Sequence, residues 1–383
     1  MILAGLLGVC VLPSAAQLNG DGYYRVVNYM TERYVYIRDN KGSIDYSTTS
    51  ADLSAIELWK DLSLAIPDPA SVIYILGVGS QYDLQSQGTG VYELIDRYVN
   101  IRTNDDGTYY AYATASGITK YIGDAETTSL AQGSASSIAS GDYRKWYINP
   151  IESDGNNYFG VEPMFNVGDK YYTPFYAEFG FSFASSGMKA YKITNVGNGM
   201  AVLEEITDDI VPGATPVIIE CSSDDPSDNR LDLYKTSVSA PSDNLLEGVY
   251  FQNSSRLTHY NQLEYDSTTM RVLGVLSDGS IGFVIGDEDY LVYAKDQDNK
   301  YSYFIPANTS YLVVPEGTAE ELTLVDNSTF TASIKGLTTV EEEKVKDDAV
   351  YTITGTKVLD SFNARNSLPS GVYIFGGKKY VVK

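Results

Sequence analysis

The chain has few of the residues on which many catalytic and metal sites depend. It holds one histidine, His259, and two cysteines, Cys10 and Cys221. A Ser-His-Asp or Cys-His site would need His259, which no supporting motif surrounds. One histidine and one cysteine outside the apolar leader cannot form a zinc site. No glycine-rich loop precedes a helix as phosphate binding requires. Carboxylate-pair chemistry stays open, because the chain has 50 acids.

Basic residues are scarce as well, which limits the partners. The 27 lysines and arginines face 50 acids and leave a net charge of −23. Nucleic-acid binding needs basic grooves that neutralise phosphates, and docking on anionic lipid needs basic patches. We therefore expect no nucleic-acid partner. The acidity itself has two interpretations, which are solubility and the binding of a divalent cation.

Calcium is the candidate cation, because closely spaced carboxylates can supply several of the oxygen ligands that it requires. Two acidic segments have such spacing. They are 221–232, with Asp224, Asp225, Asp228 and Asp232, and 286–291. Neither follows the spacing of an EF-hand loop, so a solvated acidic loop is the alternative.

Long apolar runs are confined to the start of the chain. Residues 2–12 are almost entirely apolar, and this length is too short to span a bilayer. The small residues that a signal peptidase reads follow at 14–16. We predict that residues 1–16 are a signal peptide, shortened at its start, with cleavage after Ala16. The mature chain would then be secreted and not membrane-spanning, and its lone Cys221 could form no intrachain disulfide.

Residues 17–163 contain one strand motif twice. RYVYIR at 33–38 precedes DNKG, and RYVNIR at 97–102 precedes TNDDG. Both copies alternate apolar and polar residues and end in Asn, Asp and Gly, which predicts strands that enter hairpins. Asp68 and Pro69 predict a short helix, with the aspartate as its cap and the proline in its first turn.

This region resembles the ricin-type β-trefoil. The likeness rests on YYRVVNYMTERYVYIRDNKG at 23–42, on WYINP at 146–150 and on the earlier Trp59. The resemblance implies a fold of repeated tyrosine-bearing strands and an ability to bind carbohydrate. We predict that Trp59 and Trp146 belong to the core.

Carbohydrate binding requires an exposed aromatic ring for the apolar face of a sugar, and carboxylates or amides for its hydroxyls. The predicted hairpins contain both kinds of side chain. The polar candidates are Asp39, Asn40, Asp45, Asn104, Asp105 and Asp106, and the aromatic candidates are Tyr36, Tyr46 and Tyr109. The alternative is that Asn and Asp occur here because hairpin turns need them.

Residues 164–335 contain two related halves. VPGATPVII at 211–219 is echoed by IPANTSYLV at 305–313, and each predicts a proline-fixed turn that leads into an apolar strand. The segments 188–206 and 270–287 each predict a hairpin. We therefore predict β-sandwich-like units, similar to β-modules that recur in secreted bacterial surface proteins.

The chain ends in a small β-unit at 350–383, after a polar linker at 336–349. Its patterns, VYTITGTKV, LPSGVYI and KKYVVK, predict three short strands. The unit resembles the C-terminal sorting domain of type IX secretion, which implies export to the cell surface. The matching residues are Val350, Tyr351, Gly355, Val358, Leu368, Gly371, Tyr373 and Lys383. A β-meander that closes the last domain is the alternative.

Together these patterns predict an all-β, multi-domain protein. It would have a β-trefoil-like N-terminal domain, β-sandwich-like units and a small C-terminal β-domain. We expect a secreted bacterial surface protein that binds a glycan or surface polysaccharide and is not an enzyme. A structural or adhesive protein that binds other proteins is the alternative, and a glycoside hydrolase with an acid pair is a further one.

Overall fold

A computed structural model shows a chain built almost entirely from β-strands, which confirms the all-β prediction. The structure describes residue 18 and residues 20–37, 56–59, 62–88, 98–115, 117–124, 131–135, 141–235, 239–250, 263–295, 300–333, 349–352, 356–360, 367–375 and 378–382. The contacts divide the chain into two units, Met1–Asp326 and Asn327–Lys383.

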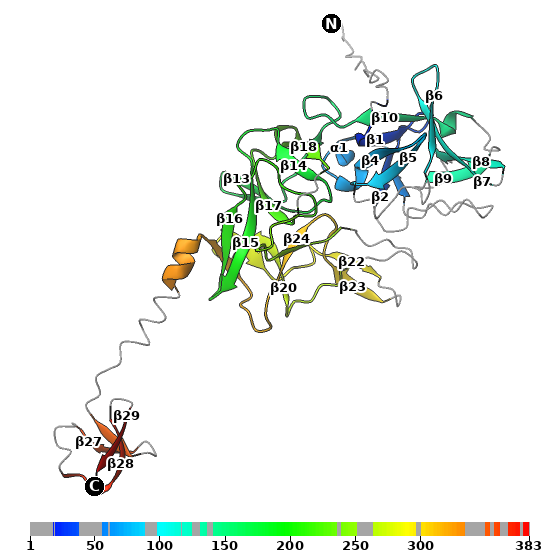
Figure 1. Cartoon of the computed structure of the whole chain (residues 1–383). Coiled ribbons are helices and arrows are strands. Elements are labelled where there is room, and N and C mark those ends of the chain that lie inside the picture. The colour runs from blue at the N-terminus through cyan, green and yellow to red at the C-terminus, as the bar shows by residue number, and fades with distance from the viewer. Residues whose placement is uncertain are drawn as a thin grey trace, which may run out of the picture. The chain divides into compact units, whose positions relative to one another are not determined.

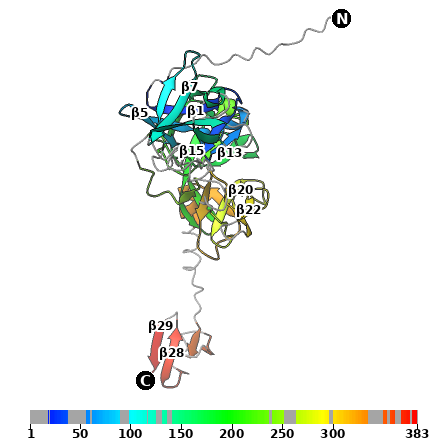
Figure 2. The same ribbon diagram turned by 90° about the vertical axis from the view of Figure 1, so that its right-hand side faces the viewer.

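Six strands of the N-terminal region close into a barrel. They are β1 (Gly22–Asn28), β4 (Ile73–Val78), β5 (Gln81–Ser86), β6 (Asn100–Thr103), β7 (Tyr109–Ala115) and β10 (Trp146–Pro150). β1 pairs with β4 and β10, β4 pairs with β5, and β7 pairs with β6 and β10. Tyr82 and Val99 complete the ring, because each N–H donates to the other residue's carbonyl at 2.8 Å and joins β5 to the start of β6. The strands β1, β5 and β7 lie together in Figure 1 and again in Figure 2.

The barrel interior is filled by alternate residues of these strands, as the period of a β-strand requires. Tyr24 and Val26 point inward from β1, and Trp146 and Ile148 point inward from β10. Trp146 is 1% exposed, and its indole N–H donates to the carbonyl of Ile122 at 3.0 Å. The predicted core position of Trp146 is therefore confirmed, whereas the side chain of Trp59 lies outside what the structure describes.

Further strands and three short helices surround the barrel. They are β2 (Tyr34–Ile37), β3 (Ile56–Trp59), β8 (Ile118–Asp124), β9 (Ala131–Ala135), α1 (Leu62–Ala65), and the 3-10 helices η1 (Pro69–Ser71) and η2 (Gly141–Arg144). The hairpin predicted to follow the strand motif at 97–102 is present as β6 and β7. The predicted helix start is confirmed too, because the Asp68 carboxylate accepts the N–H of Ala70 at 2.8 Å as the cap of η1.

The following region is organised around one continuous ten-stranded sheet. Its order is β12 (Phe165–Val167), β13 (Lys170–Phe175), β17 (Val217–Cys221), β15 (Lys189–Gly197), β16 (Met200–Glu205), β25 (Leu322–Val325), β21 (Ile281–Val284), β20 (Met270–Val275), β24 (Ser310–Val313) and β19 (Leu246–Gly248). Two smaller sheets accompany it. They are β11 (Phe159–Gly160), β18 (Arg230–Tyr234) and β14 (Gly180–Phe183), with η3 (Pro226–Asp228) beside them, and the hairpin β22 (Val292–Lys295) and β23 (Tyr301–Phe304).

The large sheet repeats one plan on either side of β25. One side has the order β13-β17-β15-β16, and the other has β19-β24-β20-β21. The two predicted hairpins are present as β15–β16 and β20–β21. The echoed proline turns also share a conformation, because Ala214 and Asn308 both have a left-handed φ of 57°. Both halves contribute to one core, with Ile193 and Ile218 from the first and Leu273 and Leu312 from the second.

The barrel and the large sheet share a second hydrophobic core. Tyr23 and Tyr74 point outward from the barrel and pack with Phe159, Phe175 and Phe179. The ring centroids of Tyr23 and Phe179 lie 6.0 Å apart in an edge-to-face arrangement, which suits aromatic quadrupoles. Strand β1 is consequently buried on both faces.

Arg25 lies on the outward face of β1 and is fully buried. It donates five hydrogen bonds, all to uncharged acceptors. These are Ser71 Oγ (3.0 Å), Asn157 Oδ1 (2.8 Å), and the carbonyls of Tyr158 (2.8 Å), Ala65 (3.0 Å) and Ile66 (3.1 Å). Burial lowers the pKa of the guanidinium to about 10. This side chain joins β1 to the loops that lead into the second region.

The C-terminal unit contains four strands where three were predicted. They are β26 (Val350–Thr352), β27 (Lys357–Leu359), β28 (Gly371–Phe375) and β29 (Lys378–Val382), in the order β27-β26-β28-β29. The first predicted strand is two paired antiparallel strands, β26 and β27. The Tyr373 hydroxyl donates to the Pro369 carbonyl at 3.0 Å, and its ring lies within 3.4 Å of where a Cβ on Gly371 would be. Two residues of the sorting-domain resemblance thus pack on each other.

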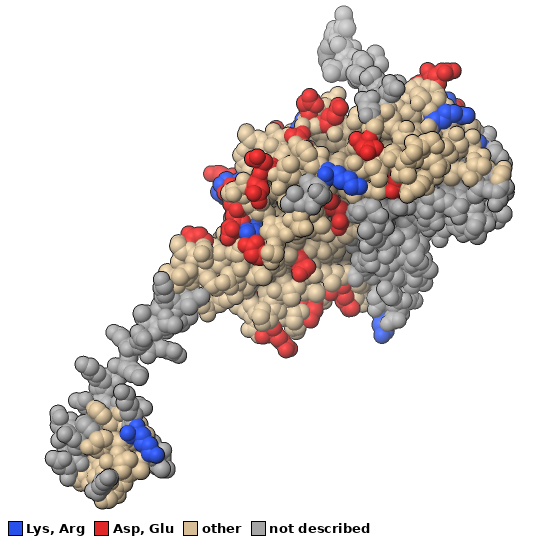
Figure 3. Space-filling view, in the orientation of Figure 1, with Lys and Arg blue, Asp and Glu red and all other residues tan. Residues whose placement is uncertain are grey.

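None of the helices in the described part of the chain has the length and apolarity that crossing a bilayer requires. On the face shown in Figure 3, acidic side chains are spread over the Met1–Asp326 unit and basic ones are few. The net charge of −23 is therefore not gathered into a single patch on that face.

Candidate functional site

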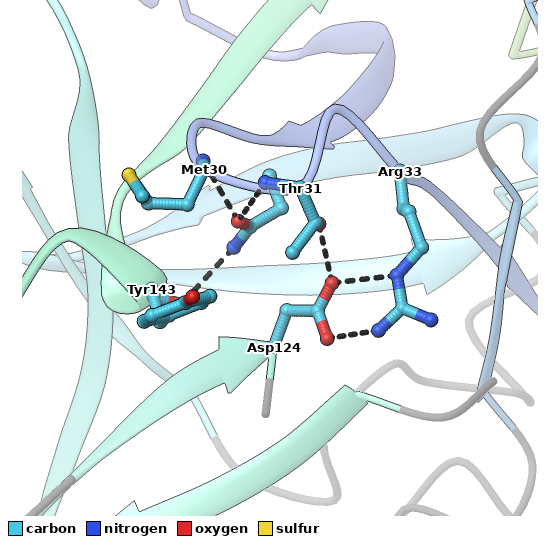
Figure 4. A network of polar contacts seen from close by, with 6 residues as sticks. Met30, Thr31, Arg33, Asp124 and Tyr143 are labelled. Carbon is cyan, nitrogen blue, oxygen red and sulfur yellow. Dashed lines mark hydrogen bonds and ion pairs between the residues drawn. The ribbon is translucent and has the colours of Figure 1, made fainter. Parts of the chain in front are cut away.

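The candidate site lies where the turn after β1 meets the segment before β10. Asn28, at the end of β1, is buried. Its Oδ1 accepts the backbone N–H groups of Met30 (3.0 Å) and Thr31 (3.2 Å), and its Nδ2 donates to the carbonyl of Tyr143 (3.0 Å). Figure 4 shows these bonds. They close a local turn of the kind that Asn favours and tie it to η2.

A shielded ion pair holds the same turn from its other side. The Asp124 side chain is fully buried and accepts hydrogen bonds from the Thr31 hydroxyl and from the Arg33 guanidinium, whose Nε donates at 2.8 Å. Figure 4 shows Arg33 reaching both carboxylate oxygens. Removing one partner of a buried pair typically costs about 3–5 kcal/mol. The turn is therefore held in one position.

Five side chains form what we call the barrel surface, outside this network. They are Tyr29, Asp106, Asp142, Lys145 and Tyr147. The Tyr29 N–H donates to the Lys145 carbonyl at 2.9 Å, and the Tyr29 and Tyr147 ring centroids lie 5.7 Å apart. Lys145 Nζ lies 5.2 Å from the Tyr29 centroid, 2.8 Å from Asp106 Oδ2 and 2.9 Å from Asp142 Oδ1. Tyr29 keeps 36% of its surface exposed, so a ring face and charged groups meet solvent together.

Hydrogen bonds fix the charges of Asp106 and Lys145 at neutral pH. The hydrogen bonds from Lys145 and then from Thr108 lower the pKa of Asp106 to about 2. The hydrogen bonds with Asp106 and then Asp142 raise the pKa of Lys145. Burial, and then the neighbouring Tyr29, raise the pKa of Tyr147, so this phenol stays neutral. The surface thus presents the charged Lys145 and Asp106 beside the neutral phenol of Tyr147, and all three groups exchange hydrogen bonds.

The structure separates the predicted sugar-binding residues. Asp105 and Asp106 are exposed in the turn between β6 and β7, and Asp106 belongs to the barrel surface. The prediction of exposed rings at Tyr36 and Tyr109 is wrong, because their exposed fractions are 0% and 2%. Tyr109 packs in the barrel core, and its hydroxyl accepts the N–H of Leu18 at 2.6 Å.

Of the remaining predicted residues, the structure describes Asn104, which is not part of the barrel surface. Asn104 supports its turn by donating from Nδ2 to Thr108 Oγ1 at 3.0 Å. Asp39, Asn40, Asp45 and Tyr46 lie outside the residues that the structure describes, as does His259.

Four members of the barrel surface were missed from the sequence, which are Tyr29, Asp142, Lys145 and Tyr147. A signal for two of them was present. Alternate residues of a strand point to opposite faces, so a core position for Trp146 places Lys145 and Tyr147 on the outer face. Tyr29 follows the last residue of β1, where no such alternation reaches it.

The acidic segments that suggested calcium use carboxylates for local hydrogen bonds. Asp225 accepts the N–H of Ser227 at 2.8 Å as the cap of η3, and Asp228 accepts the hydroxyl of Ser223 at 3.0 Å. Asp287 accepts two N–H groups of the turn that follows it. Among the described residues, no three His, Cys, Asp or Glu side chains gather closely enough to hold a metal ion. Calcium binding stays a prediction from the sequence.

A groove of about 390 Å³ lies between the loops around η1 and the large sheet. Four prolines line it, and Leu64 and Met164, which are 53% and 47% exposed, lie on its wall. The prolines are Pro67, Pro69, Pro163 and Pro174. Asp68 and Glu162 add carboxylates to this mainly apolar lining.

No protein-family model matches the chain, and no curated protein matches it. Among solved structures, the chain is similar to one described as "Structure and mode of action of a mosquitocidal holotoxin", with 11% identity and a TM-score of 0.25. The match covers 77% of this chain and 34% of the toxin chain, so this chain spans about a third of that protein's length. A TM-score this low assigns neither a fold nor a function to this chain.

Proposed function

We propose that this chain is a secreted bacterial surface protein that binds a glycan at the barrel surface and is not an enzyme. One observation carries the proposal, which is the exposed ring of Tyr29 beside Lys145, Asp106 and Asp142. An aromatic face receives the apolar side of a sugar ring, and charged groups exchange strong hydrogen bonds with its hydroxyls. The ricin-type likeness of residues 17–163 supports the same ligand class.

The electrostatics of the barrel surface favour binding over acid–base catalysis. A general acid works best with a pKa near the working pH. The pKa of Asp106 is held at about 2, so this carboxylate stays charged and accepts hydrogen bonds. Residues that are fixed in one charge state suit ligand recognition.

Export rests on the two ends of the chain. The apolar leader at 1–16 and the sorting-domain resemblance at 350–383 support secretion and display on the cell surface. The packing of Tyr373 on Gly371 gives two residues of that resemblance a structural role. In a host with type IX secretion, removal of residues 350–383 should keep the protein out of the surface fraction, as a cell-fractionation immunoblot would measure.

A glycan array probed with the full chain tests the binding proposal. Tyr29→Ala removes the exposed ring, and Tyr98→Ala is the matched control, because Tyr98 is 47% exposed and lies outside the barrel surface. We expect the wild type and Tyr98→Ala to bind the same glycans and Tyr29→Ala to lose them. Equal array profiles for all three chains would contradict glycan binding at the barrel surface.

The proline-lined groove favours a second candidate, an adhesive protein that binds other proteins. Its exposed Leu64 and Met164 offer an apolar surface of the kind that partner side chains cover. If the groove binds a partner protein, Leu64→Ser with Met164→Ser should abolish capture of that protein. The glycans that the chain binds on the array should stay the same. Capture that persists in this double variant would exclude the groove.

A further inference from the structure

The hairpin β22–β23 carries three tyrosines on one face, and we call these the tyrosine ribbon. Tyr293 lies opposite Tyr303 in the register, and Tyr301 is its diagonal neighbour. Residues opposite and diagonal to each other share a face of an antiparallel pair. The centroid of Tyr293 lies 5.0 Å from that of Tyr301, at an interplanar angle of 17°, and 4.9 Å from that of Tyr303. The three rings form one continuous aromatic array.

Core packing accounts for Tyr303, which packs against the cluster that contains Val249 and Val272, but not for Tyr293 and Tyr301. Tyr293 and Tyr301 are 59% and 60% exposed, the largest exposed fractions among the exposed apolar side chains of the described chain. The opposite face of the same hairpin supplies the buried contact, through Phe304 at 3% exposed. A contiguous aromatic patch that stays in water is typical of an interaction site.

Carboxylates border the tyrosine ribbon. The Tyr303 hydroxyl donates to Glu288 Oε1 at 2.8 Å. Asp289 is exposed next to Glu288. These groups are hydrogen-bond acceptors that carry negative charge. They suit a neutral ligand rich in hydroxyl donors.

We propose that the tyrosine ribbon is a second glycan-binding site, which takes a neutral polysaccharide. The exposed faces of Tyr293 and Tyr301 receive the apolar faces of sugar rings. Glu288, with the phenol that it holds, accepts hydrogen bonds from the sugar hydroxyls. The site uses none of the residues of the barrel surface, so it stands independently of the barrel proposal.

Native gel electrophoresis of the full chain tests this site, with hydroxyethyl cellulose, soluble starch or yeast mannan cast in the gel and polygalacturonate as the anionic comparison. We expect at least one neutral polymer to retard the wild type. Tyr293→Ala with Tyr301→Ala removes both exposed rings and should weaken that retardation about tenfold in apparent affinity, which corresponds to about 1.4 kcal/mol. Tyr293→Phe with Tyr301→Phe keeps the rings and should retain most of it.

Tyr98→Ala is the matched control and should migrate like the wild type, and Tyr29→Ala reports any retardation that the barrel surface causes. Thermal unfolding by circular dichroism establishes that each variant is folded. The proposal is overturned if no neutral polymer retards the wild type, or if a folded double alanine variant is retarded as strongly as the wild type. It is also overturned if only Tyr29→Ala loses retardation, a result that would assign the binding to the barrel surface.

Discussion

Arg25→Met should destabilise the Met1–Asp326 unit strongly, although the residue touches no carboxylate. The substitution replaces the guanidinium by the shorter, apolar side chain of methionine and removes all five donors. Two of the bonds, to Ser71 Oγ and to the Ala65 carbonyl, are fully buried. The other three are partly buried, so water can replace the guanidinium there.

The magnitude follows from the two buried acceptors. The Ala65 carbonyl still accepts the Ser71 hydroxyl at 2.8 Å in the variant, so the cost is that of two lost hydrogen bonds from a charged donor, each worth about 1.5–3 kcal/mol. The relief of the buried guanidinium opposes this cost. The lowered pKa of Arg25, about 10, reflects that burial. We expect a loss of about 3 kcal/mol in the free energy of unfolding.

Urea unfolding followed by the fluorescence of the buried Trp146 measures this loss. Arg102→Met is the matched control, because Arg102 is exposed and its guanidinium carbon lies 4.9 Å from the Tyr110 centroid, a contact worth about 0.5–1 kcal/mol. Arg25→Lys keeps the charge without the planar fork and should fall between wild type and Arg25→Met. If Arg25→Met unfolds at the same urea concentration as Arg102→Met, the five hydrogen bonds of Arg25 do not stabilise the fold, and the expected loss is refuted.

Three further predictions concern pH, thiol chemistry and backbone packing. The pKa of Asp106 falls from 3.8 to about 2 on folding, so its stabilisation is present above pH 3.8 and is lost as the pH falls through about 2. The urea midpoint of wild type should therefore drop more than that of Asp106→Asn over this window, and equal drops would contradict the ion pair. Burial raises the pKa of the Cys221 thiol to about 12. In a Cys10→Ser chain, mass spectrometry should show no iodoacetamide adduct at about pH 8 until urea unfolds the protein. An adduct on the folded chain would place this thiol at the surface. In Gly213→Ala the new Cβ would lie 2.2 Å from the Glu178 carbonyl oxygen, so we expect a loss of about 1–3 kcal/mol. An unchanged melting temperature would argue against that close approach.

The local parts of the fold could be predicted from the sequence, because their partners are near in the chain. The hairpin β6–β7 was predicted from alternation and a turn sequence, and Gly107 adopts the left-handed φ of 78° that favours glycine in such a turn. The Asp68 cap was predicted for the same reason, since its acceptor and donor lie two residues apart.

Hydrogen bonds between residues far apart in the sequence could not be predicted. The sequence also did not show which face of β7 is buried. The acceptors of Arg25 lie 40 to 133 residues away, and no local pattern links them to β1. Tyr109 and Tyr110 are adjacent and both aromatic, so alternation alone cannot show which of them points inward. The structure decides it by pairing Tyr109 with Trp146 and thereby turning Tyr109 into the barrel core.

Calorimetric titration of the strongest glycan from the array into the full chain tests the central claim most directly. If the barrel surface binds it, Tyr29→Ala should raise the Kd about tenfold, and Tyr98→Ala should leave it unchanged. A Kd for folded Tyr29→Ala equal to that of the wild type would contradict glycan binding at the barrel surface.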